Sequence, residues 1–276
     1  MPLSIVKEEL EPMPNKFSTE AVPRWRNDSA LAGKHVIVTG AGGEIGRATA
    51  IAFAEAGSIV VAVDLNPDTV QQTVDLLPGE RHKGLACNLA ELDTHAKIFQ
   101  LATDGAPLAA VAHLAAVLLR RDTVDEITEA DWDLQHSVNL KATFFLNRMA
   151  RDTFVQQGTA GAIVNFSSQG WWTGGFGGSV VYAASKGGVV SMSRGLARSF
   201  APDNVRVNVL APGGVDTSML HGGQGANSVK AFVDMIPLGR LASPEEMTGA
   251  VLFLCSDASS YMTGALLNIS GGQLMY

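Results

Sequence analysis

Short apolar runs alternate with amphipathic stretches along most of the chain. Apolar runs rich in Val, Ile, Leu and Ala are typical of strands buried on both faces, and apolar residues three or four positions apart are typical of helices. The runs predict seven strands, at 35–39, 58–64, 84–89, 108–114, 162–167, 205–210 and 266–269. The stretches between them predict helices at 45–56, 67–77, 92–102, 129–157 and 179–200.

This alternation predicts the architecture. Strands that alternate with helices form right-handed βαβ units and a parallel sheet. We therefore expect an α/β protein with a single Rossmann-type, doubly wound domain, in which a seven-stranded parallel sheet is flanked by helices on both faces. A capping box at Ser243–Glu246, with Pro at the first helical position, predicts the start of one more helix with a structural role.

The first residues of the chain differ from the rest. Four prolines lie between Met1 and Ala32, and the charges there follow no clear period. We interpret 1–32 as an N-terminal arm, loosely ordered or packed on a neighbouring subunit, and 33–276 as the one folded domain.

Composition excludes several classes of protein. The 276 residues carry a net charge of −7, unlike a nucleic-acid binder, which needs clustered Lys and Arg. The apolar runs are too short to cross a bilayer, and the acidic N-terminus is unlike a secretory signal. Cys87 and Cys255 lie in apolar stretches, which indicates reduced core thiols and a cytoplasmic protein. The six histidines lack metal-ligand spacing, so we expect no metal.

A glycine-rich turn follows the first strand. The sequence TGAGGEIG at 39–46 joins that strand to a helix, where backbone N–H groups and the helix N-terminus can face a pyrophosphate. Asp64 ends the second strand, about 20 residues on, where a carboxylate binds the adenosine ribose hydroxyls. Its charge would repel the 2′-phosphate of NADP, and no Arg or Lys lies within the turn or directly after Asp64. The pattern predicts NAD as cofactor, with a tight turn and a solvated Asp as the alternative.

Tyr182 and Lys186 are four residues apart in a predicted helix, so their side chains share one face. An ammonium about 4 Å from a phenol stabilises the phenolate by roughly 4 kcal/mol at a surface-like dielectric, or about three pKa units, if desolvation is ignored. This predicts a tyrosine able to exchange protons near neutral pH. The same spacing also occurs on ordinary helix faces.

Polar residues elsewhere strengthen the catalytic interpretation. Ser167 and Ser168 end the fifth strand, at the sheet edge where doubly wound folds bind ligands, so a hydroxyl there could bind a substrate oxygen beside Tyr182. Asn139 lies inside the predicted helix 129–157. It is either a satisfied core amide or a group that holds a water near Lys186.

With these motifs in place, the sequence resembles the classical subgroup of the short-chain dehydrogenase/reductase family. The resemblance covers about 34–272, nearly all of the chain after the arm. It rests on the glycine turn and Asp64, and on SVNLKATFF at 137–145, IVNFSS at 163–168, YAASK at 182–186, RVNVLAPGGVDTSM at 206–219 and GALLNISGG at 264–272.

The resemblance implies a role for each site residue. Tyr182 would give or take the substrate proton, Lys186 would lower its pKa and bind the nicotinamide ribose, Ser168 would orient the substrate oxygen, and Asn139 would support a water linked to Lys186. It also implies a homotetramer. The residues implied to bind NAD are Gly40, Gly43, Glu44, Ile45, Gly46, Asp64, Leu65, Asn88, Leu89, Ala115, Ala116, Tyr182, Lys186, Pro212, Gly213, Val215 and Thr217.

The chain departs from the family pattern at four places. Glu44 replaces a glycine of the turn, and we expect its side chain to point away from the pyrophosphate. Asn88 replaces an Asp near the adenine. His113-Leu114-Ala115-Ala116 replaces Asn-Asn-Ala-Gly, which lines the adenosine ribose, and Ser270 replaces the Asp of the C-terminal Asp-Gly-Gly. None of the four removes a catalytic group.

The segment between Ser168 and Tyr182 should border the reacting carbon. Trp171, Trp172 and Phe176 either provide aromatic walls for an apolar, cyclic substrate or pack in the core or at a subunit contact. The glycine-containing segment 219–232 predicts a mobile lid, with His221 in reach of substrate or in solvent. We interpret Trp132 and His136 as packing residues.

The sequence therefore predicts an NAD-dependent oxidoreductase that transfers a hydride between nicotinamide and a small secondary alcohol or ketone (EC 1.1.1). An NAD-binding regulator without turnover is one alternative. An enoyl reductase on the same fold is another, although those enzymes usually space Tyr and Lys more widely.

Overall fold

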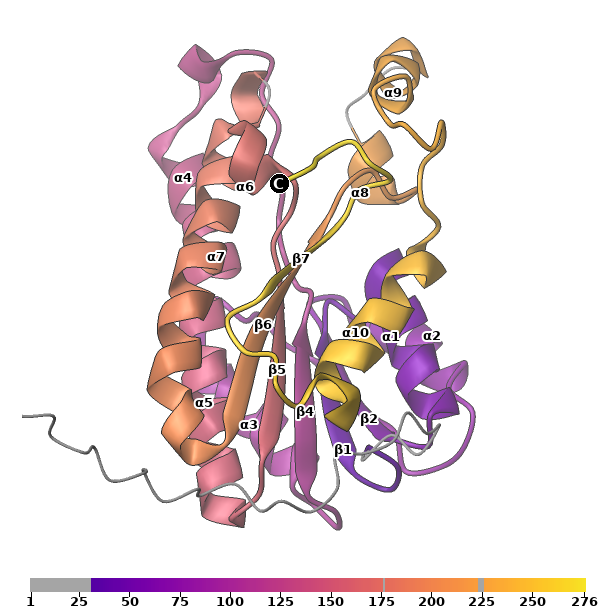
Figure 1. Ribbon diagram of the computed structural model, residues 1–276, viewed down its shortest axis with the longest axis vertical. Helices are drawn as coiled ribbons and strands as arrows, with labels where there is room; N and C mark the ends of the chain where they lie inside the picture. The colour runs from indigo at the N-terminus through magenta and orange to yellow at the C-terminus, as the bar shows by residue number, and fades with distance from the viewer. Residues whose placement is uncertain (1–30, 176, 223–225) are drawn as a thin grey trace, which may run out of the picture.

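A computed structural model describes residues 31–175, 177–222 and 226–276. Its centre is one sheet of seven parallel strands in the order β3-β2-β1-β4-β5-β6-β7 (Figure 1). The strands are β1 (His35–Thr39), β2 (Ile59–Asp64), β3 (Lys83–Ala86), β4 (Leu108–His113), β5 (Gly161–Phe166), β6 (Val205–Pro212) and β7 (Leu266–Ile269). The order reverses between β1 and β4, and this switch point is where doubly wound folds bind ligands.

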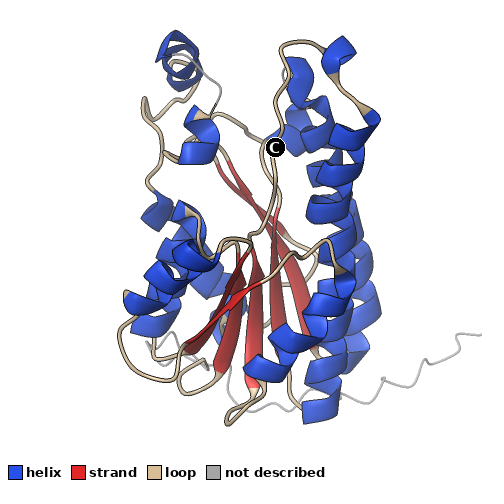
Figure 2. Cartoon of the chain, turned by 180° about the vertical axis from the view of Figure 1, so that it is seen from behind, coloured by secondary structure: helices blue, strands red, loops and turns tan. Residues whose placement is uncertain are grey.

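Helices cover both faces of the sheet (Figure 2). One face packs on α1 and α10, and the other packs on α3, α5 and α7. The helices are α1 (Glu44–Glu55), α2 (Pro67–Asp75), α3 (His95–Ala102), α4 (Glu129–His136), α5 (Ala142–Gln157), α6 (Gly170–Thr173), α7 (Val180–Phe200), α8 (Ser218–His221), α9 (Ala226–Val233) and α10 (Thr248–Cys255).

Alternation along β1 explains the two cores. Val36 and Val38 face the side of α1, where Phe53 is fully buried, whereas Ile37 faces the side of α5, where Phe154 is fully buried. Successive residues of a strand point to opposite faces, so a strand between two helical layers needs apolar residues at every position. The predicted fold class is confirmed.

The largest difference from the sequence prediction lies within 129–157. A π-helical turn at Ser137–Lys141 separates α4 from α5 and contains the buried Asn139. Such turns insert one extra residue into a helix and occur often at functional sites. Apolar periodicity does not register one extra residue, so the sequence predicted one uninterrupted helix.

The start of the domain also differs slightly from the prediction. Leu31, assigned to the arm, is buried in the core, and its carbonyl accepts a hydrogen bond from the Ser58 hydroxyl. Residues 1–30 of the predicted arm lie outside the described residues. Cys87 and Cys255 are unpaired.

Two kinds of feature are absent from the described residues. None of their helices combines the length and hydropathy needed to span a membrane. In the same part of the chain, no three His, Cys, Asp or Glu residues are grouped as metal ligands would be.

Candidate active site

A cavity of about 400 Å³ opens at the carboxyl ends of the strands. It is bounded by the glycine turn, by the ends of β4, β5 and β6, by α7, and by α8 and α9. Most residues that the sequence assigned to the site line it together. These are Gly40, Gly43, Glu44, Ile45, Gly46, Asp64, Ala115, Ala116, Ser168, Tyr182, Lys186, Pro212, Gly213, Val215 and Thr217.

Four predicted site residues do not line this cavity. Leu65 is exposed and Leu89 packs in the core. The Asn88 side chain bonds its own turn, accepting from Ala90 N and donating to Glu91. Asn139 is buried behind the cavity wall. The roles predicted for these four stay predictions.

Glycine is required at two positions of the turn. Gly40 has a φ of +71°, and a Cβ there would come within 2.8 Å of the Ala115 nitrogen. A Cβ at Gly46 would overlap the Gly40 carbonyl. Only glycine lets the turn, the end of β4 and the start of α1 approach this closely.

Asp64 is held at the end of β2 by backbone groups. Its Oδ2 accepts from Gly42 N at 2.9 Å and its Oδ1 accepts from Leu65 N at 2.7 Å. A cation that was not expected at this site, Arg47, also contacts the turn. Arg47, on α1, folds back on the turn, and its Nη2 lies 3.3 Å from the Gly42 carbonyl oxygen. The carboxylate on which the cofactor prediction rests therefore shares this region with a guanidinium.

Tyr182, Lys186 and Ser168 lie together as predicted. Lys186 Nζ is 5.7 Å from the centre of the Tyr182 ring and donates to the Phe166 carbonyl at 2.8 Å. Ser168 forms a side-chain hydrogen bond with Tyr182. The Ser168 Oγ also accepts from Gly170 N at 3.2 Å, which fixes this hydroxyl at the end of β5.

The protonation states differ from the sequence expectation. Burial raises the pKa of Tyr182 to about 12, although the hydrogen bond from Ser168 and the charge of Arg120 act in the opposite direction. Burial also lowers the pKa of Lys186 to about 7. The attraction between ammonium and phenolate, which the expected pKa rested on, is outweighed by desolvation of both groups. At neutral pH Tyr182 is a phenol, ready to donate a proton.

Asn139 positions the loop that follows β4. Its Oδ1 accepts from Val117 N at 2.8 Å, and its Nδ2 donates to the Val117 carbonyl at 2.9 Å and to Ser185 Oγ at 3.0 Å. The amide thus joins the loop to α7, the helix that carries Tyr182 and Lys186. These bonds occupy the side chain, so a water near Lys186 would have to use another group of Asn139.

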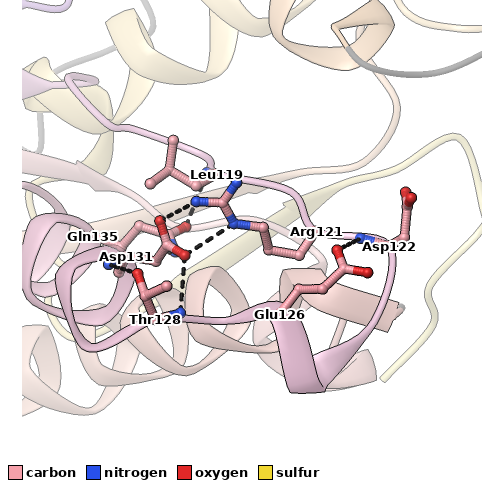
Figure 3. A network of polar contacts seen from close by, with 7 residues as sticks. All are labelled: Leu119, Arg121, Asp122, Glu126, Thr128, Asp131 and Gln135. Atoms are coloured by element: carbon pink, nitrogen blue, oxygen red, sulfur yellow. Dashed lines mark hydrogen bonds and ion pairs between the residues drawn. The ribbon is translucent and has the colours of Figure 1, made fainter.

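Two residues of α4, the helix before the π-helical turn, also bind the loop and form a ladder of contacts with Asn139. Gln135 Oε1 accepts from Leu119 N at 3.1 Å, and Asp131 binds Arg121 through Nε and Nη2 at 2.9 and 2.5 Å (Figure 3). The contacts involve every fourth residue of the helical segment (131, 135 and 139) and every second residue of the loop (121, 119 and 117). Four helical residues rise about 6 Å and two extended residues about 6.6 Å, so the two repeats match. The loop 117–121 is therefore a built wall of the cavity.

Sequence reasoning missed several residues of the cavity. Arg120 and Leu118, from this loop, line it beside Gln169 and Phe232. Gln169 Oε1 is buried and has no hydrogen-bond partner among the described residues. In the sequence, only the adjacent Arg120-Arg121 pair marked the loop as part of a site. The position of the loop residues depends on contacts with a distant helix, which spacing does not show.

One expectation for the segment 170–178 was that its aromatic residues form walls of the substrate site. The described tryptophans are placed elsewhere. The cavity receives Gly170, Thr173 and Gly175 from this segment but neither tryptophan. The Trp171 and Trp172 rings pack on the C-terminal Tyr276, with ring centres 5.5 and 5.7 Å away. The two tryptophans are thus not walls of the described cavity, and Phe176 lies outside the described residues.

Other aromatic and histidine side chains lie outside the cavity. His221 Nε2 is 2.6 Å from Asp216 Oδ1 and is half exposed. Trp132, which the sequence assigned to packing, is half exposed and stacks on His136 with ring centres 4.1 Å apart. Neither histidine lines the cavity.

His113, one of the departures from the family pattern, completes a chain of hydrogen bonds. Thr39 Oγ1 is 2.7 Å from its Nδ1, and its Nε2 is 2.9 Å from Thr143 Oγ1, which donates to the Asn139 carbonyl. Thr143 donates its only hydroxyl proton to the Asn139 carbonyl, so its Oγ1 can only accept from the ring of His113. Nε2 is therefore the protonated nitrogen of His113. Burial lowers the pKa of His113 to about 3, which keeps the ring neutral. His113 therefore connects the first strand to the π-helical turn.

Glu44 and Ser270 are both hydrogen-bonded. Glu44 Oε1 accepts from Ser218 N at 2.9 Å, so the carboxylate turns towards α8 while it still lines the cavity. Ser270 Oγ accepts from Leu274 N at 3.1 Å and stabilises the C-terminal turn. That the Glu44 side chain points away from the pyrophosphate stays a prediction, which its bond to α8 supports.

The cavity fits a nicotinamide dinucleotide. The glycines of the turn let backbone atoms form one part of the cavity lining, and Asp64 and Gln169 contribute to the lining elsewhere. Tyr182, Lys186 and Ser168 lie on the same wall as Gln169. A dinucleotide-binding fold with a Ser-Tyr-Lys group in its cavity defines a nicotinamide-dependent oxidoreductase of the Rossmann type.

Comparisons with known proteins agree with this class. A family model described as "Enoyl-(Acyl carrier protein) reductase" matches residues 40–273. The chain is 36% identical to D-threitol dehydrogenase of Mycolicibacterium smegmatis, covering 89% of this chain and 94% of the relative. It is 35% identical to the 3-oxoacyl-[acyl-carrier-protein] reductase of Thermotoga maritima, covering 88% and 98%.

A solved structure from Beutenbergia cavernae, assigned as an NAD(P)-dependent gluconate 5-dehydrogenase with bound NADP, superimposes with a TM-score of 0.80. It is 33% identical and covers 88% of this chain and 97% of that one. The chain therefore belongs to the short-chain dehydrogenase/reductase family.

Proposed function

We propose that the protein is an NAD-dependent dehydrogenase that transfers a hydride between nicotinamide and a secondary alcohol or its ketone. The observation that carries the proposal is the shared cavity wall of Ser168, Tyr182 and Lys186, beside the glycine turn. A protein that only bound the cofactor would not need these three groups together. Relatives named as a threitol dehydrogenase and an oxoacyl reductase support alcohol and ketone chemistry.

In the reducing direction the cofactor supplies the hydride, and the chain supplies position and a proton. Ser168 and Tyr182 would bind the carbonyl oxygen of the substrate. Tyr182 holds its proton at neutral pH, so it would donate this proton to the oxygen as the alcohol forms. In the oxidising direction Tyr182 must first lose its proton, and alkaline pH would favour that reaction.

The preference for NAD rests on Asp64. Its carboxylate is fixed by Gly42 N and Leu65 N and lines the cavity, so a 2′-phosphate would meet a negative charge. Arg47, which bonds the carbonyl of Gly42 in the same turn, would reduce this repulsion, and the Beutenbergia cavernae relative holds NADP. NAD is therefore the proposed cofactor, and the charge balance between Asp64 and Arg47 is the feature that decides it.

We also propose a cytoplasmic homotetramer that acts on small molecules and binds neither nucleic acid nor membranes. The support is an exposed face on α4 and α5, where Trp132 and Phe144 are each more than one third exposed beside a shallow hollow lined by Leu140 and Phe145. Sedimentation analysis of the purified protein tests the tetramer.

Tyr182→Phe is the test of the proposed reaction. With NAD and a panel of polyols, sugars, sugar acids, cyclic alcohols and steroids, formation of reduced cofactor should fall by about 10²- to 10⁴-fold relative to wild type. Cofactor binding, measured by calorimetry, should persist. Tyr261→Phe is the matched control, because Tyr261 is fully exposed and remote from the cavity.

Ketones and crotonyl-type thioesters, tested with NADH beside this panel, separate the alternative functions. Equal turnover by wild type and Tyr182→Phe would contradict the acid/base role. NAD binding without turnover of any alcohol, ketone or thioester would favour the regulator. Reduction of crotonyl-type thioesters in preference to ketones would favour the enoyl reductase, the activity that the description of the family model names.

A further inference from the structure

Arg120 is a cation in the wall of the cavity. Its Nη1 donates to the backbone carbonyls of Met219 and Gly222, both at 2.8 Å. Among residues 31–175, 177–222 and 226–276, the Nε and Nη2 groups have no hydrogen-bond acceptor and the guanidinium has no carboxylate partner. One edge of the guanidinium thus holds α8 and the chain after it, and the other is available to a ligand.

The neighbouring charges leave this cation uncompensated. Arg121, the next residue, is neutralised by Asp131, and the ladder from α4 holds the loop in place. The carboxylates that line the cavity, Glu44 and Asp64, bond backbone N–H groups of other segments. Within the described part of the chain, Arg120 is therefore a preformed positive group without a negative partner.

Arg120 also acts on the reacting end of the cavity. Its charge lowers the pKa of Tyr182, so the guanidinium and the phenol influence each other within the same space. Leu118, Leu220 and Phe232 contribute apolar surface to the same cavity. A charge-assisted hydrogen bond is stronger in such surroundings than in water, and the fork of a guanidinium suits the two oxygens of a carboxylate.

We propose that Arg120 binds an oxyanion carried by the substrate, so that the enzyme prefers hydroxy acids and oxo acids, or alcohols with a phosphate ester, to neutral alcohols. The inference rests on the proposed function, because it concerns the substrate of the same site. The bound anion would share the guanidinium with the Met219 and Gly222 carbonyls, which would hold α8 over the cavity while substrate is present.

The competing interpretation is that Arg120 only fastens α8. Matched pairs of probes distinguish the two: gluconate with glucitol, 3-hydroxybutyrate with its methyl ester, and glycerol 3-phosphate with glycerol. Binding of each to the NAD-saturated protein is measured by calorimetry. We expect at least one acid to bind about 10- to 100-fold more tightly than its neutral partner. The third pair shows whether the anion is a carboxylate or a phosphate.

Variants then assign the preference to Arg120. Arg120→Met should abolish the difference between acid and neutral probe, and Arg120→Lys should retain part of it. Lys230→Met is the control, because it removes an exposed positive charge from α9 outside the cavity and should leave the preference unchanged. Equal binding of acid and neutral probes by wild type, or an equal loss of both in Arg120→Met, overturns the proposal.

The two proposals can fail separately. Turnover of neutral alcohols that depends on Tyr182, with no preference for acids, would remove the role of Arg120 and keep the dehydrogenase. Preference for acids without any turnover in wild type would keep the anion site and remove the dehydrogenase.

Discussion

Asp131 binds the guanidinium of Arg121 with both carboxylate oxygens and also accepts from Thr128 N at 3.0 Å. One side chain thus starts α4 and holds the loop that forms a wall of the cavity. Asp131→Asn keeps the size of the side chain and removes its charge. We expect Tm to fall by roughly 2–4 °C, the change typical of one lost interaction in a domain of this size, and KM for substrate to rise more than kcat falls.

Glu126→Gln is the matched control for this change, because Glu126 belongs to the same network but accepts only from Asp122 N. Arg121 holds the pKa of Asp131 below the ordinary value of 3.8, so the stabilisation is complete above that pH and decreases as pH falls below it. Asp131→Asn should therefore lose less stability than wild type on acidification. Identical acid unfolding curves would contradict this role.

Burial of Lys186 makes the stability of the cofactor-free protein depend on pH. The folded pKa is about 7 and the ordinary value is 10.5, so between these values the unfolded chain binds a proton that the folded chain has lost. The contribution of Lys186 to the free energy of unfolding should therefore rise with pH, by up to about 1.4 kcal/mol per pH unit. Urea unfolding at pH 7, 8 and 9 should show this rise in wild type and a smaller slope in Lys186→Met. Equal slopes would mean that Lys186 keeps its proton when folded.

Cofactor choice should follow the balance between Asp64 and Arg47. Asp64→Asn keeps an acceptor oxygen for the glycine turn and removes the charge that a 2′-phosphate would meet. The ratio of kcat/KM with NAD to that with NADP should fall by roughly 10- to 100-fold. Adding Arg47→Met to this variant should then weaken the binding of NADP without a comparable loss in the binding of NAD. An unchanged ratio in Asp64→Asn would assign the preference to another group.

The fold was predictable because the signals that define each strand and helix lie within that element or directly beside it in the sequence. Each βα unit of this chain has its own apolar period and its own stop signals, such as Gly57 after α1 and Gly158 after α5. The Ser168, Tyr182 and Lys186 group was also predictable, because strand ends meet at one sheet edge and four residues make one helical turn.

The missed features depend on contacts between distant segments. Arg47 and Arg120 were absent from the predicted site because the first folds back on a turn and the second is positioned by a ladder 10 to 22 residues away. Spacing alone does not show such contacts. The expected pKa of Tyr182 failed for a related reason, since burial, which reversed the direction of the shift, is a property of the folded chain.

Glu44 provides the last prediction. Burial opposes its ionisation, yet hydrogen bonds from Ser218 and from its own backbone N–H hold the pKa of Glu44 below its ordinary value, so a negative charge stands at the start of α1. A pyrophosphate at that helix N-terminus would be repelled by it. Glu44→Gln keeps an oxygen for Ser218 N and removes the charge. We expect the Kd for NAD to fall roughly three- to ten-fold, as measured by calorimetry.

Glu44→Ala removes both the charge and the contact with Ser218 N, so its comparison with Glu44→Gln separates the two effects. If the bond to Ser218 N also positions α8, the Ala variant should bind NAD as tightly as the Gln variant but show a higher KM for substrate, since Met219 and Leu220 of α8 line the cavity. A Gln variant with unchanged or weaker affinity for NAD would show that the carboxylate does not act on the pyrophosphate. The contact with α8 would then be the reason for Glu at this position of the turn.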